Sequence, residues 1–282
     1  MRTWRWYTRL IMKHGPAAIF IVLVIIFAFF PFYWMIITSF KPPSEIFRDP
    51  PTFIPQNLYL GGYRKLLVDP AFVGYMKNST IVAGGTALIA TFVASFAAYS
   101  FSKFRFPGNR VMSFSLFLTQ LFPQSVILVP LFIVFQHYRL YDTYAALILS
   151  NLAFSVPVSI WLMIGFFEAI PQELGDAALI DGCSRLGVLF RIILPIARTG
   201  VVATAMYIFI SAWSELLFAL TFTTSKTIRT LPVALSMFIG QYTADWSGLL
   251  AAATLTCLPV AIIFLVLQRY FIEGMTSGAM KE

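Results

Sequence analysis

Charged residues are scarce in this sequence: they make up 11% of its 282 residues, whereas 59% are hydrophobic and 29 are phenylalanine. Soluble globular domains carry about 25% charged and about 45–50% apolar residues. A chain with so little polar surface cannot cover itself in water, so the composition excludes an ordinary soluble domain and predicts a membrane protein. The net charge of +8 does not call for nucleic acid, because basic residues beside apolar segments set membrane orientation and meet anionic lipid heads.

Cysteine and histidine are equally rare, with two residues of each type. Cys183 lies in a polar segment and Cys257 in a late apolar one, so no disulfide between them is expected. His14 and His137 lie far apart in the sequence, beside basic or aromatic neighbours near the ends of apolar segments. We interpret both as membrane-interface residues and predict no metal site.

Catalytic and nucleotide-binding motifs are missing as well. The sequence has no GxxxxGK[ST] phosphate loop, no HExxH and no GxSxG. No nucleophile is paired with a base in the pattern. We therefore expect neither an enzyme nor a chain that binds ATP or another cofactor by itself.

What the sequence has instead is long apolar segments, since about 20 helical residues cross the hydrocarbon core. The first segment is too long for a signal-peptide core and is not followed by a cleavage site, so we interpret it as a retained anchor. We predict an all-α membrane protein, with residues 1–282 as a single domain and six transmembrane helices. The predicted spans lie near 17–40, 80–101, 111–135, 144–167, 200–222 and 249–271.

Prolines occur inside these predicted spans. In water they would oppose a helix, but neighbouring helices and cavity waters can satisfy the freed carbonyl groups in a membrane bundle. Kinked or interrupted helices around a pathway are therefore expected at Pro31, Pro123, Pro130, Pro157 and Pro259.

Basic residues predict the orientation of the chain. The N-terminal tail and the short loop "KFRFPGNR" are dense in Lys and Arg, which favours the cytoplasmic side. Six spans then place both termini inside. The periplasmic loop is residues 41–79, in which the stretch 63–80 is expected to form short surface helices, while loop 168–199 and tail 272–282 face the cytoplasm.

A polar insert, "GDAALIDGCSRLGVLFRIILP", stands in the inner loop between two very apolar segments. Pro171 suits the first helical position, Glu173 suits the positive end of the helix dipole, and Asp181-Gly182 is a plausible stop. A helix this short is marginal in water unless a partner surface holds it. The spacing places Glu173, Asp176 and Ala177 on one face, so we predict a docking element rather than a plain connector.

The insert resembles the EAA signature of permeases of ABC importers. That signature is Glu-Ala-Ala, three residues, Gly, nine residues, Ile, one residue and Leu-Pro. The same spacing is present here as Asp176-Ala177-Ala178, Gly182, Ile192 and Leu194-Pro195, with Asp in place of the first Glu. The shorter acid keeps the charge and changes its reach toward a partner.

Other stretches look like the maltose-type carbohydrate permeases, in particular the second, shorter subunit of the pair. The tail "YFIEGMTSGAMKE", with Gly274, Gly278 and Lys281, matches that pattern, as do "AWSELLFAL" and "MKNST". These stretches are less specific than the insert. The resemblance covers the chain from its first predicted span to its last residue.

The resemblance implies the fold of a type I ABC importer permease in a bacterial or archaeal inner membrane. Two six-span permeases would pair as a heterodimer, two ATPase subunits carrying ATP and magnesium would dock from inside, and an external solute-binding protein would deliver a sugar, oligosaccharide or polyol derivative. The ATPase-coupling residues would be Glu173, Asp176, Ala177, Ala178, Asp181 and Gly182, with a second contact at Gly278 and Lys281 in the tail.

Glu215 is the only acid predicted well inside a span, where a charge is costly unless it faces protein or water. With it, the substrate pathway is predicted to include Ser211, Trp213, Ser214, Gln120, Gln124, Asn151 and Ser155. Trp213 would offer a ring for a sugar face. The alternative is that these groups only hold helices together or contact the partner permease.

Two further functions remain open. One is an importer of a non-sugar solute. The other is a stand-alone secondary transporter or channel, which predicts inverted repeats or ionisable residues inside several spans. A membrane-embedded enzyme would need clustered acids or histidines near the interface, and the pattern shows none.

Overall fold

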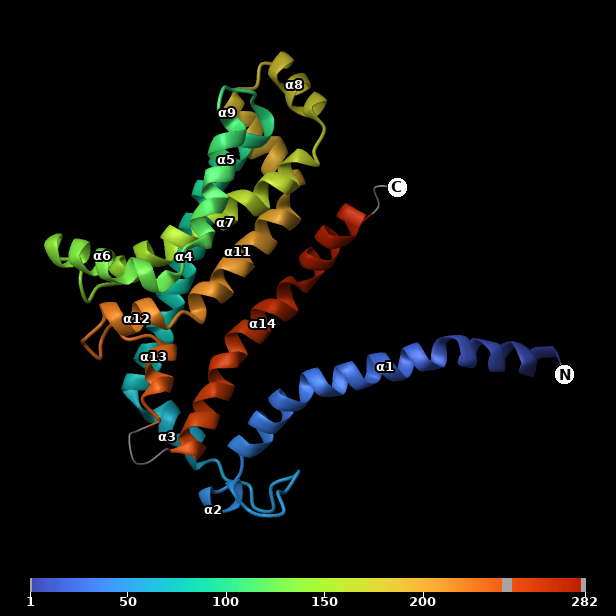
Figure 1. Cartoon of the computed structure of the whole chain (residues 1–282), viewed down its shortest axis with the longest axis vertical. Coiled ribbons are helices and arrows are strands. Elements are labelled where there is room, and N and C mark those ends of the chain that lie inside the picture. Colours follow the sequence, from blue (N-terminus) through green and yellow to red (C-terminus); the bar gives the residue numbers. More distant parts are fainter. Residues whose placement is uncertain (1, 240–244, 280–282) are drawn as a thin grey trace. The chain divides into compact units, whose positions relative to one another are not determined.

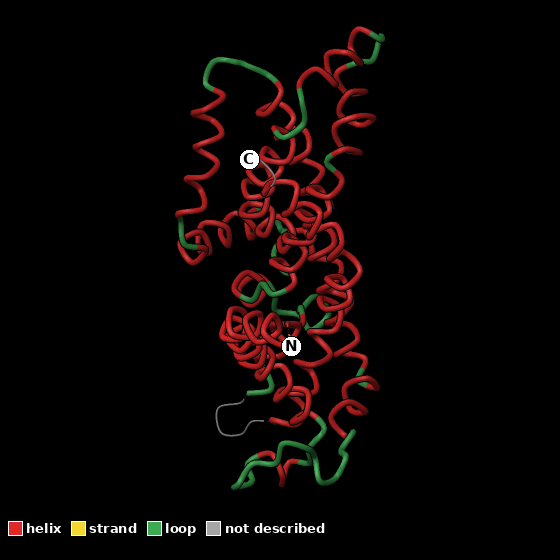
Figure 2. The backbone as a smooth tube through the Cα atoms, turned by 90° about the vertical axis from the view of Figure 1, so that its right-hand side faces the viewer, coloured by secondary structure: helices red, strands yellow, loops and turns green. Residues whose placement is uncertain are grey.

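Helices make up the regular structure of the part of the chain that the structure describes. The computed structural model describes residues 2–239 and 245–279, and Figure 2 shows them as helices joined by loops, with no strand. The chain divides into two compact units, Met1–Val68 with Phe238–Leu255, and Asp69–Met237 with Thr256–Glu282. The all-α prediction is confirmed over the described residues.

Three helices form the centre of the second unit: α4 (Pro70–Lys103), α7 (Tyr144–Glu168) and α11 (Arg198–Trp213), which pack side by side (Figure 1). A Cβ on Gly200 of α11 would lie 2.2 Å from the Phe166 ring of α7, so the two helices approach closely there. Small residues permit such approach, and van der Waals packing then drives helix association in a membrane. On α4 the small residues form a buried stripe of alanines, Ala83, Ala87, Ala90, Ala94 and Ala98.

The predicted third span, 111–135, is bent rather than straight. Here α5 (Asn109–Leu118) and the 3-10 turn η1 (Thr119–Leu121) meet α6 (Gln124–His137) at an angle of 96°. Pro123 lacks a backbone N–H and pushes Phe122 into an extended conformation, which stops the helix. Of the five prolines expected to interrupt spans, this is the one at a helix break, and the others lie within continuous helices.

The predicted fifth span, 200–222, also contains a break. α11 ends at Trp213, and α12 (Leu217–Phe222) begins after the three residues 214–216. The chain then continues to α13 (Leu231–Ser236). Before α11, helical segments run from Arg185 to Ile196 and are bent by 81° relative to α11. Hydropathy is high on both sides of residues 214–216, so the apolar pattern did not indicate this break.

Four helices among the described residues are long and apolar enough to cross a membrane: Ala17–Ser39 within α1 (Arg2–Ser39), α4, α7, and Trp246–Gln268 within α14 (Trp246–Ala279). The number rises to the predicted six when each bent pair is one span. Helix α4 begins at Pro70, so residues 70–79 are helical and extend the predicted second span toward its N-terminus. Pro70 occupies the first turn, and the Asp69 side chain caps it by accepting from the Ala71 N–H.

Asn78 of α4 holds the loop between α12 and α13 against two helices of the second unit. Its side-chain amide donates to the carbonyl oxygens of Thr227 at 2.8 Å and Arg229 at 2.7 Å. Its oxygen accepts from the Tyr144 hydroxyl of α7 at 2.6 Å. One buried side chain thus joins two helices and this loop.

Asp142, in the turn before α7, holds the same loop from the other side. Its carboxylate accepts from the backbone N–H groups of Thr224 at 2.9 Å and Ser225 at 3.1 Å. Partial burial raises the pKa of the Asp142 carboxyl, but the hydrogen bonds from Thr224 and Ser225 outweigh it and the pKa lies below its ordinary value. The carboxylate is therefore charged at neutral pH, which keeps both bonds charge-assisted.

In the first unit, α1 is followed by a compact loop that contains α2 (Pro43–Ile46) and leads to α3 (Gly61–Val68). Lys41 is buried, donates to the Thr52 carbonyl oxygen and lies 4.4 Å from the centre of the Trp34 ring. Glu45 accepts from the Thr52 hydroxyl at 2.6 Å and from the Gln56 N–H at 3.0 Å, and the Thr52 bond is the largest cause of a pKa below the usual range for Glu45. The expected short helices of the stretch 63–80 are α3 and the first turns of α4.

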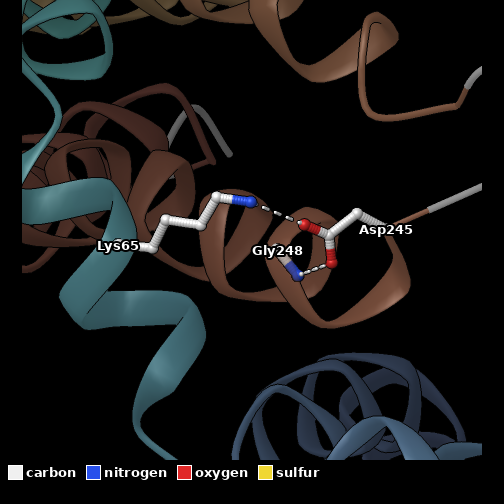
Figure 3. Close-up of polar contacts among 3 residues, drawn as sticks. All are labelled: Lys65, Asp245 and Gly248. Atoms are coloured by element: carbon white, nitrogen blue, oxygen red, sulfur yellow. Dashed lines mark hydrogen bonds and ion pairs between the residues drawn. The ribbon is translucent and has the colours of Figure 1, made fainter.

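The start of α14 is capped within the first unit (Figure 3). The Asp245 carboxylate accepts from the Gly248 N–H at 2.8 Å and lies 3.4 Å from the Lys65 ammonium group of α3. Both charged side chains are largely exposed, so the ion pair contributes little and the cap contributes most of the stabilisation.

Candidate functional site

The insert singled out in the sequence folds as α8 (Gln172–Ile180), followed by a left-handed turn. Gly182 has φ +84°, its N–H bonds to the Leu179 carbonyl at 3.1 Å, and the Cys183 N–H bonds to the Ala178 carbonyl at 2.9 Å. This pair of bonds is the Schellman motif, which satisfies the last carbonyl groups of a helix. The backbone requires glycine at 182, because an L side chain is strained at that φ even though a Cβ would meet no atom within 4 Å.

The other end of α8 differs from the prediction by one residue. Pro171 is the cap that precedes the helix and Gln172 is its first residue. The backbone of Pro171 is extended (φ −56°, ψ 139°) and lies outside the helical region, so the helix cannot begin before Gln172. Glu173 lies in the first turn, where an acid interacts favourably with the helix dipole.

One side of α8 packs against the rest of the protein, and most of its other side chains are exposed. Gly175 is buried against Val188, and Ala178 is half-buried on the same side. Of the side chains expected to meet a partner, Glu173, Asp176 and Ala177 are exposed, whereas Ala178 packs against the core. The C-terminal residues Asp181 and Gly182 are exposed too, and so are the apolar residues Leu174, Leu179 and Ile180, the last to 87%.

After α8 the chain returns through α9 (Arg185–Val188), the π-helical turn η2 (Leu189–Ile193) and α10 (Leu194–Ile196). π-Helical turns are rare and occur often at functional sites. Val188, Leu189 and Ile193 are buried in a core with residues of α4 and α7, so the return segment anchors the base of α8.

The predicted tail contact falls at the end of the described chain. Gly278 lies in the last turn of α14, whereas Lys281 lies outside the described residues.

A cavity of about 360 Å³ opens at the break between α11 and α12. It brings together six side chains predicted for the pathway, from three helices and the break: Gln124, Asn151, Ser155, Ser211, Ser214 and Glu215. Phe154 and Leu216–Phe218 line it as well, and the sequence reasoning did not select them. Phe154 follows Asn151 by three residues and is therefore on the same helix face, a spacing that could have found it.

Glu215 has a structural partner within this cavity. One carboxylate oxygen accepts from the Phe218 N–H at 2.7 Å and the other from the Ala219 N–H at 3.1 Å, so the side chain caps α12. Each carboxylate oxygen has a further lone pair. Glu215 therefore has the structural role given by the alternative, as the cap of α12, and it also lies in the cavity, where a pathway residue is expected.

Trp213 and Gln120 are placed differently from the prediction. Trp213 is 4% exposed, stacks on Phe209 and donates from its indole N–H to the Thr256 carbonyl oxygen at 3.2 Å, so its ring is not offered to a solute here. Gln120 donates to the Phe154 carbonyl oxygen at 3.2 Å and thereby joins η1 to α7. The half-buried Phe154 ring lines the cavity where the Trp213 ring was expected.

Sequence comparison assigns most of the chain to one family. Residues 72–277, which include α4, the cavity and α8, match the family described as "Binding-protein-dependent transport system inner membrane component".

Relatives with transport names match nearly the full length. The chain is 34% identical over 263 residues to the trehalose/maltose transport system permease protein MalG of Thermococcus litoralis, covering 92% of this chain and 94% of that one. It is 33% identical over 266 residues to the trehalose transport system permease protein SugB of Mycobacterium tuberculosis, covering 94% and 96%. It is 31% identical over 259 residues to the sulfoquinovosyl glycerol transport system permease protein SmoH of Agrobacterium fabrum, covering 92% and 91%.

Solved structures agree on the fold. A chain of a bacterial ABC transporter involved in the import of the acidic polysaccharide alginate superposes with a TM-score of 0.78 at 23% identity, over 93% of this chain and 98% of that chain. A chain of the MetNI methionine ABC transporter superposes with a TM-score of 0.58 at 16% identity, over 74% and 96%. The fold is that of ABC importer permeases.

Proposed function

The chain belongs to the family of binding-protein-dependent transport system inner membrane components, so it is a multi-pass permease subunit of an ABC importer rather than an enzyme, and we propose that its solute is a carbohydrate. The relatives named for trehalose, maltose and sulfoquinovosyl glycerol transport all handle glycosides. The proposed solute class is therefore a sugar, oligosaccharide or polyol derivative, delivered by an external binding protein.

The cavity at the break between α11 and α12 is the observation that carries this proposal. Its polar lining consists of amides and hydroxyls from Gln124, Asn151, Ser155, Ser211 and Ser214, with one carboxylate from Glu215. Uncharged donors and acceptors beside an aromatic ring suit a neutral solute rich in hydroxyl groups. Its volume of about 360 Å³ is at the lower end for a ligand site, in keeping with a pathway completed by a second permease.

The exposed side of α8 is the proposed docking surface for an ATPase subunit. Glu173 offers a carboxylate, Ala177 allows close approach, and the exposed side chain of Ile180 offers apolar surface to a partner. Asp176 and Leu179 are exposed as well, at the edge of the space beneath α8. The tail from Gly278 to Lys281 is proposed as a second contact. In this arrangement ATP and magnesium are bound by the ATPase subunits.

The mechanism we propose couples two states through α8. Two ATPases that close on ATP move the docking helices of this chain and of a second six-span permease, and the paired bundles tilt from inward-open to outward-open. A ligand of the partner thus biases a two-state element in this chain. With this docking role we propose that α8 and both termini lie on the cytoplasmic side.

Uptake by the reconstituted transporter tests this function. Proteoliposomes that contain this chain, its second permease and the ATPases are expected to take up labelled trehalose or maltose only with ATP and the binding protein. Gln124→Leu removes a cavity amide and should lower uptake by roughly tenfold, since a lost polar contact to a solute costs about that much. Gln136→Leu is the matched control, because Gln136 lies on the same helix and does not line the cavity.

Two outcomes contradict the proposal. Uptake that persists without ATP and binding protein would instead support a stand-alone secondary transporter or channel. ATP-driven uptake of a non-sugar solute, with the carbohydrates inert as competitors, would keep the importer and overturn the carbohydrate.

A further inference from the structure

Lys103, the last residue of α4, is bonded to the segment that leads into α8. Its ammonium group donates to the Ile170 carbonyl oxygen at 2.6 Å, across 67 positions of sequence. Ile170 lies between the end of α7 and the start of α8. Its side chain is 5% exposed and is buried in the core formed with α4, α7 and the return segment after α8. A charged donor makes this bond roughly twice as strong as a neutral one.

The Lys103–Ile170 hydrogen bond matters because a cavity lies beneath α8. A cavity of about 220 Å³ lies between α8 and the elements under it, and its lining includes Lys103, Asp176, Leu179 and Arg185. Where a cavity separates two elements, side-chain packing cannot transmit movement between them, because the surrounding atoms have no partners across the gap. The links beside this cavity include the packing of Ala178 against the core that contains Val188 and Leu189, and the Lys103–Ile170 bond.

The C-terminal end of α4, which carries Lys103, is held by further contacts. The Asn109 side-chain amide donates to the carbonyl oxygens of Phe101 at 3.0 Å and Phe104 at 2.9 Å, which closes the C-terminal end of α4. The Arg185 guanidinium lies 5.0 Å from the centre of the Phe104 ring, a cation–π contact that brings α9 to the same point.

We propose that Lys103 is a positioning residue that transmits the movement of α8 to α4, and through α4 to the solute cavity. This proposal rests on the proposed docking of an ATPase on α8. Helix α4 packs against α7 and α11, and these helices carry the cavity residues Asn151, Ser155 and Ser211. The Lys103–Ile170 bond therefore connects the docking helix to the helices that line the pathway.

The test compares coupling with basal activity in the full reconstituted transporter. Lys103→Met keeps the length of the side chain and removes the charge and the donor. We expect basal ATP hydrolysis within about twofold of wild type, but stimulation by the solute-loaded binding protein, and uptake with it, lowered by roughly tenfold. Lys103→Arg should restore most of both, since it keeps the charged donor.

Arg105→Gln is the matched control, because Arg105 is an exposed cation two residues from Lys103. It should behave like wild type. If the Met variant does not assemble, Lys103→Gln replaces it, with a shorter neutral donor and the same expected loss of stimulation.

Full stimulation and uptake in the Met variant would overturn the role of Lys103. Equal loss of basal and stimulated hydrolysis that Arg does not rescue would also overturn it, since that result indicates a structural residue. Wild-type proteoliposomes that take up no carbohydrate would contradict the proposed function instead, so the two failures are distinguishable.

Discussion

Single residues in this chain combine a local structural task with the role expected from the sequence. Glu215 caps α12 through the N–H groups of Phe218 and Ala219, and it also lines the cavity that we propose for the solute. Gly182 stops α8 because its φ of +84° is open to glycine. An acid at 215 and a glycine at 182 are therefore both accounted for by the local backbone, without any partner protein.

At Gly182 the structure sharpens the expected effect of substitution. Gly182→Ala should weaken the turn after α8 by about 1–2 kcal/mol, the cost of a left-handed conformation with a Cβ. Uptake per ATP hydrolysed should fall while the chain still inserts in the membrane. Gly182→Asn is the control, because Asn adopts this conformation more readily. The measurement is uptake and hydrolysis in the same proteoliposomes, and normal coupling in the Ala variant would count against the assigned role of this turn.

Among the elements, α4 has the central place in the second unit. Its alanine stripe faces α7 and α11, its C-terminal end carries Lys103, and its N-terminal third carries Asn78. Alanine gives the neighbouring helices close approach along the whole length of the contact. The helix is therefore suited to move with α7 and α11 as one body.

The tight packing of α4 predicts a large response to added volume. Ala94 is fully buried, so Ala94→Leu should destabilise the helix core by about 1–3 kcal/mol, the range for overpacking. The measurement is the midpoint of thermal unfolding of the purified chain in detergent. Val93→Leu adds volume at the neighbouring exposed position and should leave the midpoint unchanged; equal midpoints for both variants would contradict the packing described here.

For the whole molecule, much apolar surface remains uncovered. The Ala17–Ser39 segment of α1 has no buried residue in its most apolar stretch, and Ile180 of α8 is 87% exposed. Apolar side chains on a membrane-length helix suit lipid or another permease, whereas an exposed apolar residue at the end of α8 suits a protein partner. The chain is therefore expected to function only in a complex.

Membrane orientation is testable with an impermeant maleimide in intact cells. In a chain with both Cys183 and Cys257 replaced by Ser, Lys226→Cys should label from outside, and Glu173→Cys should label only after permeabilisation. The reason is that α11 and the short α12 separate the two exposed positions. The reverse pattern would contradict the cytoplasmic position of α8.

The sequence predicted the fold class, the family and the helical insert, with its end at Gly182 and its start wrong by one residue. It also selected six of the residues that line the cavity. It did not show the break at residues 214–216, because the apolar pattern continues across it. It placed Trp213 in the pathway, and a tertiary contact with Thr256 and stacking on Phe209 bury that ring.

The amino-acid sequence by itself determined the membrane environment, the helical state and the helical insert at α8, because these depend on composition and on spacing within a few turns. Tertiary structure alone decided which polar groups share a cavity, that the Glu215 carboxylate caps a helix, and that Lys103 reaches Ile170. The physical reason is distance along the chain: hydropathy and helix spacing describe neighbours in sequence, whereas these contacts arise only when packed helices bring remote residues together.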